Sequence, residues 1–271
     1  MINQIYKVIA FLRRDFKTEL SYRFSFLLNL AGISFSVIMF YYISKLFGKA
    51  ASPYLEDYGG DYFSFVIIGI AFSGYLSVSL HSFSGAIREG QMLGTLEAMM
   101  VTPTGIPAII LFSGLWSFIS TTVEVIIYLL AGVIIFGLDL GKANILSAIT
   151  VMILTILSFS PLGVISASFI MAFKRGDPIA FLFGSASSLL GGVYYPITIL
   201  PSWLQDISHL LPITYSLRAM RYSLIKGSTL SEISSDLFAL GFFSAFMIPL
   251  SLMAFSYAVR KAKEKGSLGQ Y

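Results

Sequence analysis

The chain is poor in charge and contains no cysteine. Only 12% of its 271 residues are charged and 56% are hydrophobic, whereas a soluble domain carries about 25% charged residues. The lack of cysteine excludes disulfides and thiolate metal sites, and His81 and His209 are too few for a histidine-based metal centre. These deficits indicate a polytopic membrane protein with little chain left over for a soluble domain.

Motifs for nucleotides and for secretion are also missing. We find neither G-x-x-x-x-G-K-[ST] nor G-x-G-x-x-G, so we expect no cofactor and no catalytic site in this chain. If ATP drives the protein, ATP and Mg²⁺ bind to another chain. The first twenty residues lack a continuous apolar run and therefore do not read as a signal peptide. The cationic run 260–265 is expected to bind anionic lipid headgroups, and no nucleic acid partner is expected.

Six apolar stretches are predicted to be transmembrane helices, because about 20 apolar residues cross a bilayer core. The fourth stretch contains Pro161, which predicts a kink near Ser158 to Pro161. Residues 3–20 have apolar side chains at helical spacing and predict an amphipathic helix in the headgroup plane; contact with a soluble partner is the alternative. The expected fold is a single all-α transmembrane domain covering residues 1–271. The six predicted spans are 24–47, 62–83, 106–136, 143–173, 179–191 and 234–259.

The chain is organised around a polar, glycine-punctuated segment between the second and third spans, residues 84–105. Gly90 and Gly94 are expected to break the chain. Thr95 can cap a short helix over residues 96–101, because its hydroxyl can accept a free backbone N–H. We interpret the segment as a short helix exposed beyond the membrane for contact with another protein. A plain interfacial turn is the alternative interpretation.

A second unusual segment, residues 192–221, lies before the last span. Three prolines divide it into apolar pieces that are too short to cross a membrane and too apolar for a free loop. This pattern predicts re-entrant or interfacial half-helices, which are tolerated only where protein or a cavity surrounds the broken backbone.

Glu124 lies near the middle of the third span. A carboxylate at this depth costs on the order of 3 kcal/mol, so water, a cation or a proton must offset that cost. Two interpretations stay open for Glu124: a place on the substrate route, or a structural hydrogen bond.

Two motifs carry a resemblance to a known family. Residues 88–103 read R-E-G-x-x-x-G-T-L-E-x-x-x-x-T-P, which resembles the coupling loop of ABC-2 type permeases, the membrane subunits of one class of ATP-driven exporter. Residues 192–205 read G-x-x-Y-P-x-x-x-L-P-x-W-L-Q, followed by P-x-T-Y and an arginine. This second motif resembles the outer re-entrant segment before the last helix of the same family.

The resemblance implies efflux of a drug, lipid or (glyco)polymer across the cell membrane. It implies a separate ABC ATPase as partner, and a homodimer or a pair with a paralogous permease. The residues it assigns to ATPase coupling are Arg88, Glu89, Gly94, Thr95, Leu96, Glu97, Met99 and Pro103. The residues it assigns to an outer gate are Tyr195, Pro196, Pro201, Trp203, Pro212 and Arg218. A secondary transporter or a membrane-embedded enzyme, without an ATPase partner, is the alternative function.

Lysine and arginine fix the predicted orientation, since cytoplasmic segments carry an excess of both. With six spans, the side that holds both termini and residues 84–105 has twelve of these residues and the other side has six. Both termini and the coupling segment are therefore expected to be cytoplasmic.

Overall fold

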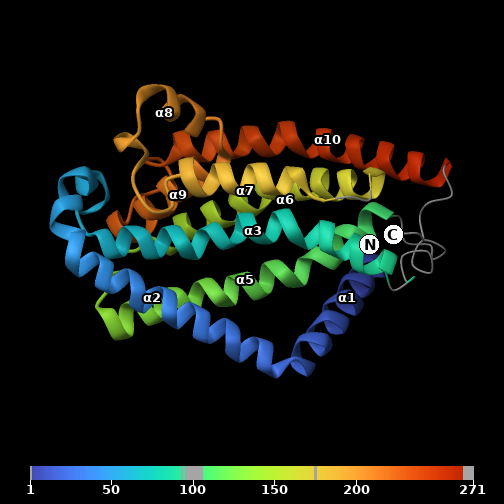
Figure 1. The fold of residues 1–271 in the computed structure, drawn as a ribbon, viewed down its shortest axis with the longest axis horizontal. Coiled ribbons are helices and arrows are strands. Elements are labelled where there is room, and N and C mark those ends of the chain that lie inside the picture. Colours follow the sequence, from blue (N-terminus) through green and yellow to red (C-terminus); the bar gives the residue numbers. More distant parts are fainter. Residues whose placement is uncertain (1, 93, 95–105, 174–175, 265–271) are drawn as a thin grey trace.

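The computed structural model describes residues 2–92, 94, 106–173 and 176–264. This part of the chain forms helices joined by turns, with no β-strand, and its long helices lie side by side in one bundle (Figure 1). The all-helical fold class predicted from composition is confirmed for the residues that the structure describes.

In the part of the chain that the structure describes, five helices are long and apolar enough to cross a membrane. The candidate for a sixth crossing, α7 (Pro178–Leu190), has 13 residues. At 1.5 Å per residue it rises about 20 Å, which is short of a hydrocarbon core of about 30 Å. The structure therefore supports a protein with several membrane spans and offers five candidates for them. The predicted sixth crossing stays a prediction. The five are α2 (Arg23–Ala51), α3 (Tyr62–Met92), α5 (Ile106–Phe136), α6 (Ile145–Phe173) and α10 (Ser234–Glu264).

α3 is the central helix. In its most apolar window 72% of the residues are buried, against 11% in α2 and 17% in α10. Tyr75 and Phe83 of α3 are fully buried between α5 and α6. A Cβ at Gly163 of α6 would lie 1.7 Å from the carbonyl oxygen of Ser79 in α3. Only glycine allows this approach, and small residues commonly bring membrane helices together in this way.

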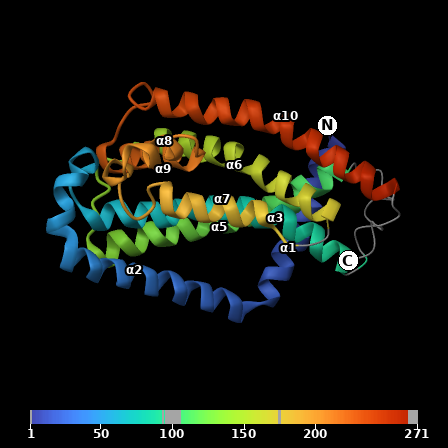
Figure 2. The ribbon, with the colours of Figure 1, turned by 45° about the horizontal axis from the view of Figure 1, so that its top comes forward.

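Short elements mark the two ends of the bundle (Figures 1 and 2). At one end, here called the α1 end, lie α1, the end of α3, the start of α5 and the end of α10. At the other, the α9 end, lie η1, α8 and α9. The bounds of these short elements are α1 (Ile2–Ser21), η1 (Ser52–Tyr58), α8 (Ser202–Ser208) and α9 (Pro212–Arg221).

The structure corrects the predicted start of the coupling segment. Residues 84–92 were expected to be loop, but α3 continues through Gly90 to Met92. Phe83 and Ile87 are one turn apart and both are buried, so the apolar stripe of the helix runs past the predicted boundary. A glycine inside a helix costs only about 1 kcal/mol, which packing of this stripe offsets. Gly94 does lie in a turn, with a φ of 66°.

α1 forms where the amphipathic pattern predicted it, and it leans on the start of α5. Phe11 packs edge-on against Phe112 with ring centroids 5.9 Å apart. Phe16 packs against Trp116 at 5.4 Å. α1 is therefore attached to the bundle along one face, while Ile9 on another face is exposed.

Each of the three prolines of the segment before α10 lies at the start of a short helix, where a residue without an N–H is tolerated. Pro196 precedes η2 (Ile197–Ile199), Pro201 precedes α8, and Pro212 is the first residue of α9. η3 (Tyr222–Lys226) follows α9 and ends at Gly227. The predicted division into short pieces is observed, and their re-entry into a membrane stays a prediction.

Candidate functional site

The predicted coupling residues lie partly within the described structure. Arg88 and Glu89 are in the last turns of α3, at the α1 end, and Gly94 follows the helix. The other five predicted residues lie outside the described residues: Thr95, Leu96, Glu97, Met99 and Pro103. The structure therefore places the base of the coupling segment and leaves its proposed contact helix as a prediction.

A polar cleft of about 680 Å³ lies beside this base, between α1, α3 and α5. Its walls include Glu89, His81 and Asp15. Arg14 donates a hydrogen bond of 2.7 Å to Asp15 at the rim, and His81 Nδ1 lies 2.8 Å from the carbonyl oxygen of Ser77. In the sequence His81 was considered only as one of two histidines too few for a metal centre, and the fold brings it to a cleft that also holds carboxylates.

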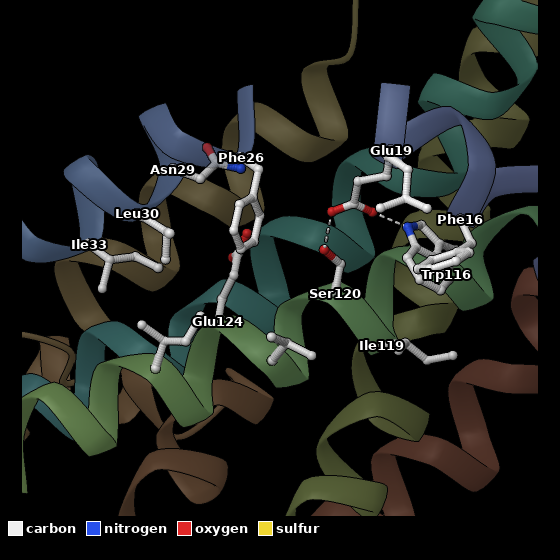
Figure 3. Close-up of a pocket in the computed structure, with 13 residues that line it drawn as sticks. Phe16, Glu19, Phe26, Asn29, Leu30, Ile33, Trp116, Ile119, Ser120 and Glu124 are labelled. Carbon is white, nitrogen blue, oxygen red and sulfur yellow. Dashed lines mark hydrogen bonds between the residues drawn. The ribbon is translucent and has the colours of Figure 1, made fainter. Parts of the chain in front are cut away.

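A second cavity, of about 300 Å³, lies between α1, α2 and α5 (Figure 3). Its lining is mostly apolar, yet Glu19 of α1 and Glu124 of α5 both point into it. Glu124 was predicted as a residue of the transport route; Glu19 was not singled out. Two carboxylates from distant parts of the chain thus share one apolar cavity.

Glu19 is held by two donors from α5. Its carboxylate accepts hydrogen bonds from Nε1 of Trp116 and from the hydroxyl of Ser120, the latter at 3.0 Å. The sequence did carry a signal for this role. Glu19 follows Leu12 and Phe16 at helical spacing, so a charged residue occupies the apolar stripe of α1. An acid on such a stripe indicates a polar partner on the facing helix.

Glu124 lies one turn beyond Ser120 on α5 and, like Phe26 of α2, lines the cavity (Figure 3). Within the described part of the chain, no hydrogen bond or ion pair holds its carboxylate. No lysine, arginine or histidine is among the residues that line the cavity. Neither of the two interpretations of Glu124 is decided by these contacts.

The predicted outer-gate residues gather at the α9 end. Arg218 of α9 makes a hydrogen-bonded ion pair with Asp236 of α10, with an N–O distance of 2.5 Å. Burial lowers the pKa of Arg218, but the hydrogen bond and charge of Asp236 outweigh it and raise this pKa above its ordinary value. The hydroxyl of Tyr195 donates to the carbonyl oxygen of Leu189. Trp203 is 62% exposed, so its ring is available to lipid or to a partner.

Arg221, at the end of α9, is buried and joins α9 to α3 and to the turn after α7. We call this set of contacts the Arg221 clamp. The guanidinium of Arg221 donates a hydrogen bond of 3.0 Å to the carbonyl oxygen of Phe65 in α3 and one of 3.1 Å to the carbonyl oxygen of Val193. Its guanidinium carbon lies 3.4 Å from the centroid of the Phe65 ring. Burial lowers the pKa of Arg221 to about 9, so it stays charged at neutral pH. Gly69 makes room for the clamp, because a Cβ there would meet Val193 O at 2.3 Å.

The described residues contain no group of three or more His, Asp or Glu side chains that could hold a metal ion. The coupling base and the outer-gate residues lie at opposite ends of the bundle, and the cavity with Glu19 and Glu124 lies between α1, α2 and α5 (Figures 1 and 3). The arrangement is that of a membrane-spanning body with distinct features at each end.

Comparisons with known proteins agree with this arrangement. The family model described as "ABC-2 type transporter" matches residues 6–225. The inner membrane transport permease YadH of Escherichia coli K12 is 21% identical over 181 residues, covering 66% of this chain and 70% of that protein, and its Shigella flexneri counterpart matches equally. The protein ycf38 of Cyanophora paradoxa, provisionally named a transport permease, is 27% identical over 223 residues, covering 79% of this chain and 73% of its own.

Proposed function

Since the chain belongs to the ABC-2 type transporter family, we propose that it is the transmembrane subunit of an ATP-driven exporter. Its coupling segment, residues 84–105, would be moved by a separate ATPase that binds ATP and Mg²⁺. The observation that carries this proposal is the family match over most of the chain, including both motif segments. The cargo would be a drug, a lipid or a (glyco)polymer moved out of the cell.

The distribution of basic residues supports an orientation with the α1 end in the cytoplasm. The side that would hold the α1 end carries twelve lysines and arginines against six on the other side, and such an excess marks cytoplasmic segments. Both chain termini would then be cytoplasmic in a cell-membrane protein.

The coupling role fits the position of residues 84–105. The end of α3 and the start of α5 flank this segment at the α1 end (Figure 1). Glu89 and Glu97 would pair with basic residues of the ATPase, and Leu96 and Met99 would bury apolar surface there. A push on the segment would tilt α3 and α5, the two helices attached to it.

Two copies of the chain, or this chain and a paralogous permease, would enclose the cargo route. α7 would complete a sixth crossing together with the turn that follows it. The short helices η2, α8 and α9, with Tyr195, Pro196, Pro201, Trp203, Pro212 and Arg218, would close the outer end. Asp236 supports this closure, because its ion pair fixes α9 to the start of α10.

Copurification tests the ATPase partner directly. The tagged chain, extracted in mild detergent, is expected to retain an ABC ATPase subunit in stoichiometric amount. Glu97→Arg is expected to lower ATP-driven transport by at least tenfold and to leave membrane insertion unchanged, because it reverses a charge at the proposed contact; Glu56→Arg, at the opposite end, is the matched control.

Normal transport by the Glu97→Arg variant would refute the coupling role. Substrate movement by the purified chain alone, driven by an ion gradient, would instead establish the secondary transporter. A membrane-embedded enzyme would convert its substrate without any partner.

A further inference from the structure

We propose that the cavity between α1, α2 and α5 binds an amphipathic organic cation, with its charged head between Glu19 and Glu124. The site is inferred from the geometry of this cavity. Its use as an entry point for cargo rests on the exporter function proposed above.

Charge selects the ligand. Glu19 and Glu124 both point into the cavity, and among the residues that the structure describes no lysine, arginine or histidine lines it. Glu19 is fixed in place by Trp116 and Ser120, while no hydrogen bond or ion pair within the described chain satisfies Glu124. A carboxylate among apolar side chains at membrane depth is costly unless a counter-charge is present. A bound cation supplies that counter-charge, and an anion of the same shape would be repelled.

The walls select an apolar body for the same ligand. Phe16, Phe26 and Trp116 line the cavity with aromatic rings, and cations bind favourably over such rings. Leu30 and Ile119 add aliphatic surface. The volume of about 300 Å³ is at the lower end of the range of about 300–1,000 Å³ for small-molecule sites. A compact cation carrying aromatic groups therefore fits better than a sugar or a polymer.

The cavity has two approaches with different chemistry. Glu19 and Trp116 line both this cavity and the polar cleft next to it, so their hydrogen bond stands at the boundary between the two. The cleft offers a polar approach for the charged head. α2 and α5 are little buried, with 11% and 22% of their most apolar windows covered, which leaves an apolar approach from the lipid side. An amphipathic molecule fits a cavity that has one polar approach and one apolar approach.

The two tryptophans of the chain allow a direct test. Trp203→Phe leaves Trp116 in the cavity wall as the sole tryptophan. The purified variant, in lipid nanodiscs without any ATPase, is titrated with tetraphenylphosphonium and with tetraphenylborate, which share a shape and differ in sign. We expect a saturable change in Trp116 emission with the cation, and binding of the anion at least tenfold weaker. Equal responses to both ions, or no saturable response, would overturn the proposal.

Variants then test whether the Glu124 carboxylate supplies the negative charge that binds the cation. Glu124→Gln keeps the shape of the side chain, and we expect it to weaken cation binding by about tenfold. Glu56→Gln, an exposed carboxylate at the α9 end, is the control with unchanged binding. Unliganded Trp116 emission identical to the parent shows that Glu124→Gln is folded; Phe26→Ala is a second variant expected to weaken binding through the aromatic wall. Full affinity in both cavity variants would refute the site.

The outcome separates this proposal from the exporter function. Cation binding without a copurifying ATPase would keep the site and reject the exporter. A copurifying ATPase without charge-selective binding would keep the exporter and reject the site. Side chains of a second copy filling the cavity would block both ions, which also rejects the site.

Discussion

The close crossing of α3 and α6 at Gly163 gives the sharpest stability prediction. Alanine at this position places a Cβ 1.7 Å from the carbonyl oxygen of Ser79 and 2.8 Å from a ring carbon of Phe83. The contact with Ser79 is to backbone, so no side-chain rotation relieves it. To reach ordinary contact at about 3.4 Å, the two helices must separate locally by about 1.7 Å. Both helices pack in the core of the bundle, so the separation propagates to their neighbours.

The expected cost follows from two opposing terms. Overpacking of a core costs about 1–3 kcal/mol, and a clash with backbone belongs at the upper end. Replacing a helical glycine by alanine returns about 1 kcal/mol through backbone entropy. Gly163→Ala should therefore lose about 2 kcal/mol of stability. Gly241→Ala in α10, where nothing lies within 4 Å of the added Cβ, should gain up to about 1 kcal/mol.

Thermal unfolding followed by tryptophan emission measures this difference. A thiol-reactive dye cannot report on a chain without cysteine. With about 2 °C per kcal/mol for a chain of this size, the midpoints of the two variants should differ by about 6 °C, with Gly163→Ala the lower. Equal midpoints would show that the helices do not approach each other as closely as described, and the reasoning from the Gly163 contact would fail.

Three further predictions concern polar contacts. Arg221→Met should lower stability by about 1–3 kcal/mol because it removes the buried hydrogen bonds to the carbonyl oxygens of Phe65 and Val193. Arg221→Lys should be at least as harmful because an ammonium keeps the buried charge without the fork that reaches both oxygens; a lysine variant with parental stability would contradict this. Asp177→Ala should cost about 1 kcal/mol in thermal unfolding, since Asp177 caps α7 by accepting a hydrogen bond from Ala180 N, while Asp177→Asn should retain most of the cap. Asp236→Asn should cost about 1–2 kcal/mol by leaving the partly buried Arg218 without its counter-charge, and reversal of the pair in the double variant Arg218→Asp and Asp236→Arg should restore part of the loss.

The sequence predicted the helices well because apolar length and proline position act locally. Pro196 and Pro201 directly precede η2 and α8, and Pro212 is the first residue of α9, positions at which proline is tolerated because no helical N–H is needed there. The end of α3 was predicted too early because Gly90 and the nearby charges outweighed the buried stripe of Phe83 and Ile87. Whether such a stripe is buried depends on neighbouring helices, which a single sequence does not place.

The candidate sites were predicted only in part for the same reason. Glu124 stood out because its position in an apolar span is visible in the sequence. Glu19 did not, because its partner Trp116 is 97 residues away. The burial of Arg221 was missed because its acceptors are backbone carbonyls of Phe65 and Val193, and backbone acceptors leave no mark on composition.

The link between α1 and α5 has a mechanical consequence. Glu19 fastens the end of α1 to the third and fourth turns of α5, and α5 is the helix that begins directly after the coupling segment. α5 therefore lines the cavity itself and also holds the end of α1 that lines it. If α5 moves, the end of α1 that is hydrogen-bonded to it should move with it relative to α2, so the width of the cavity should depend on the position of α5.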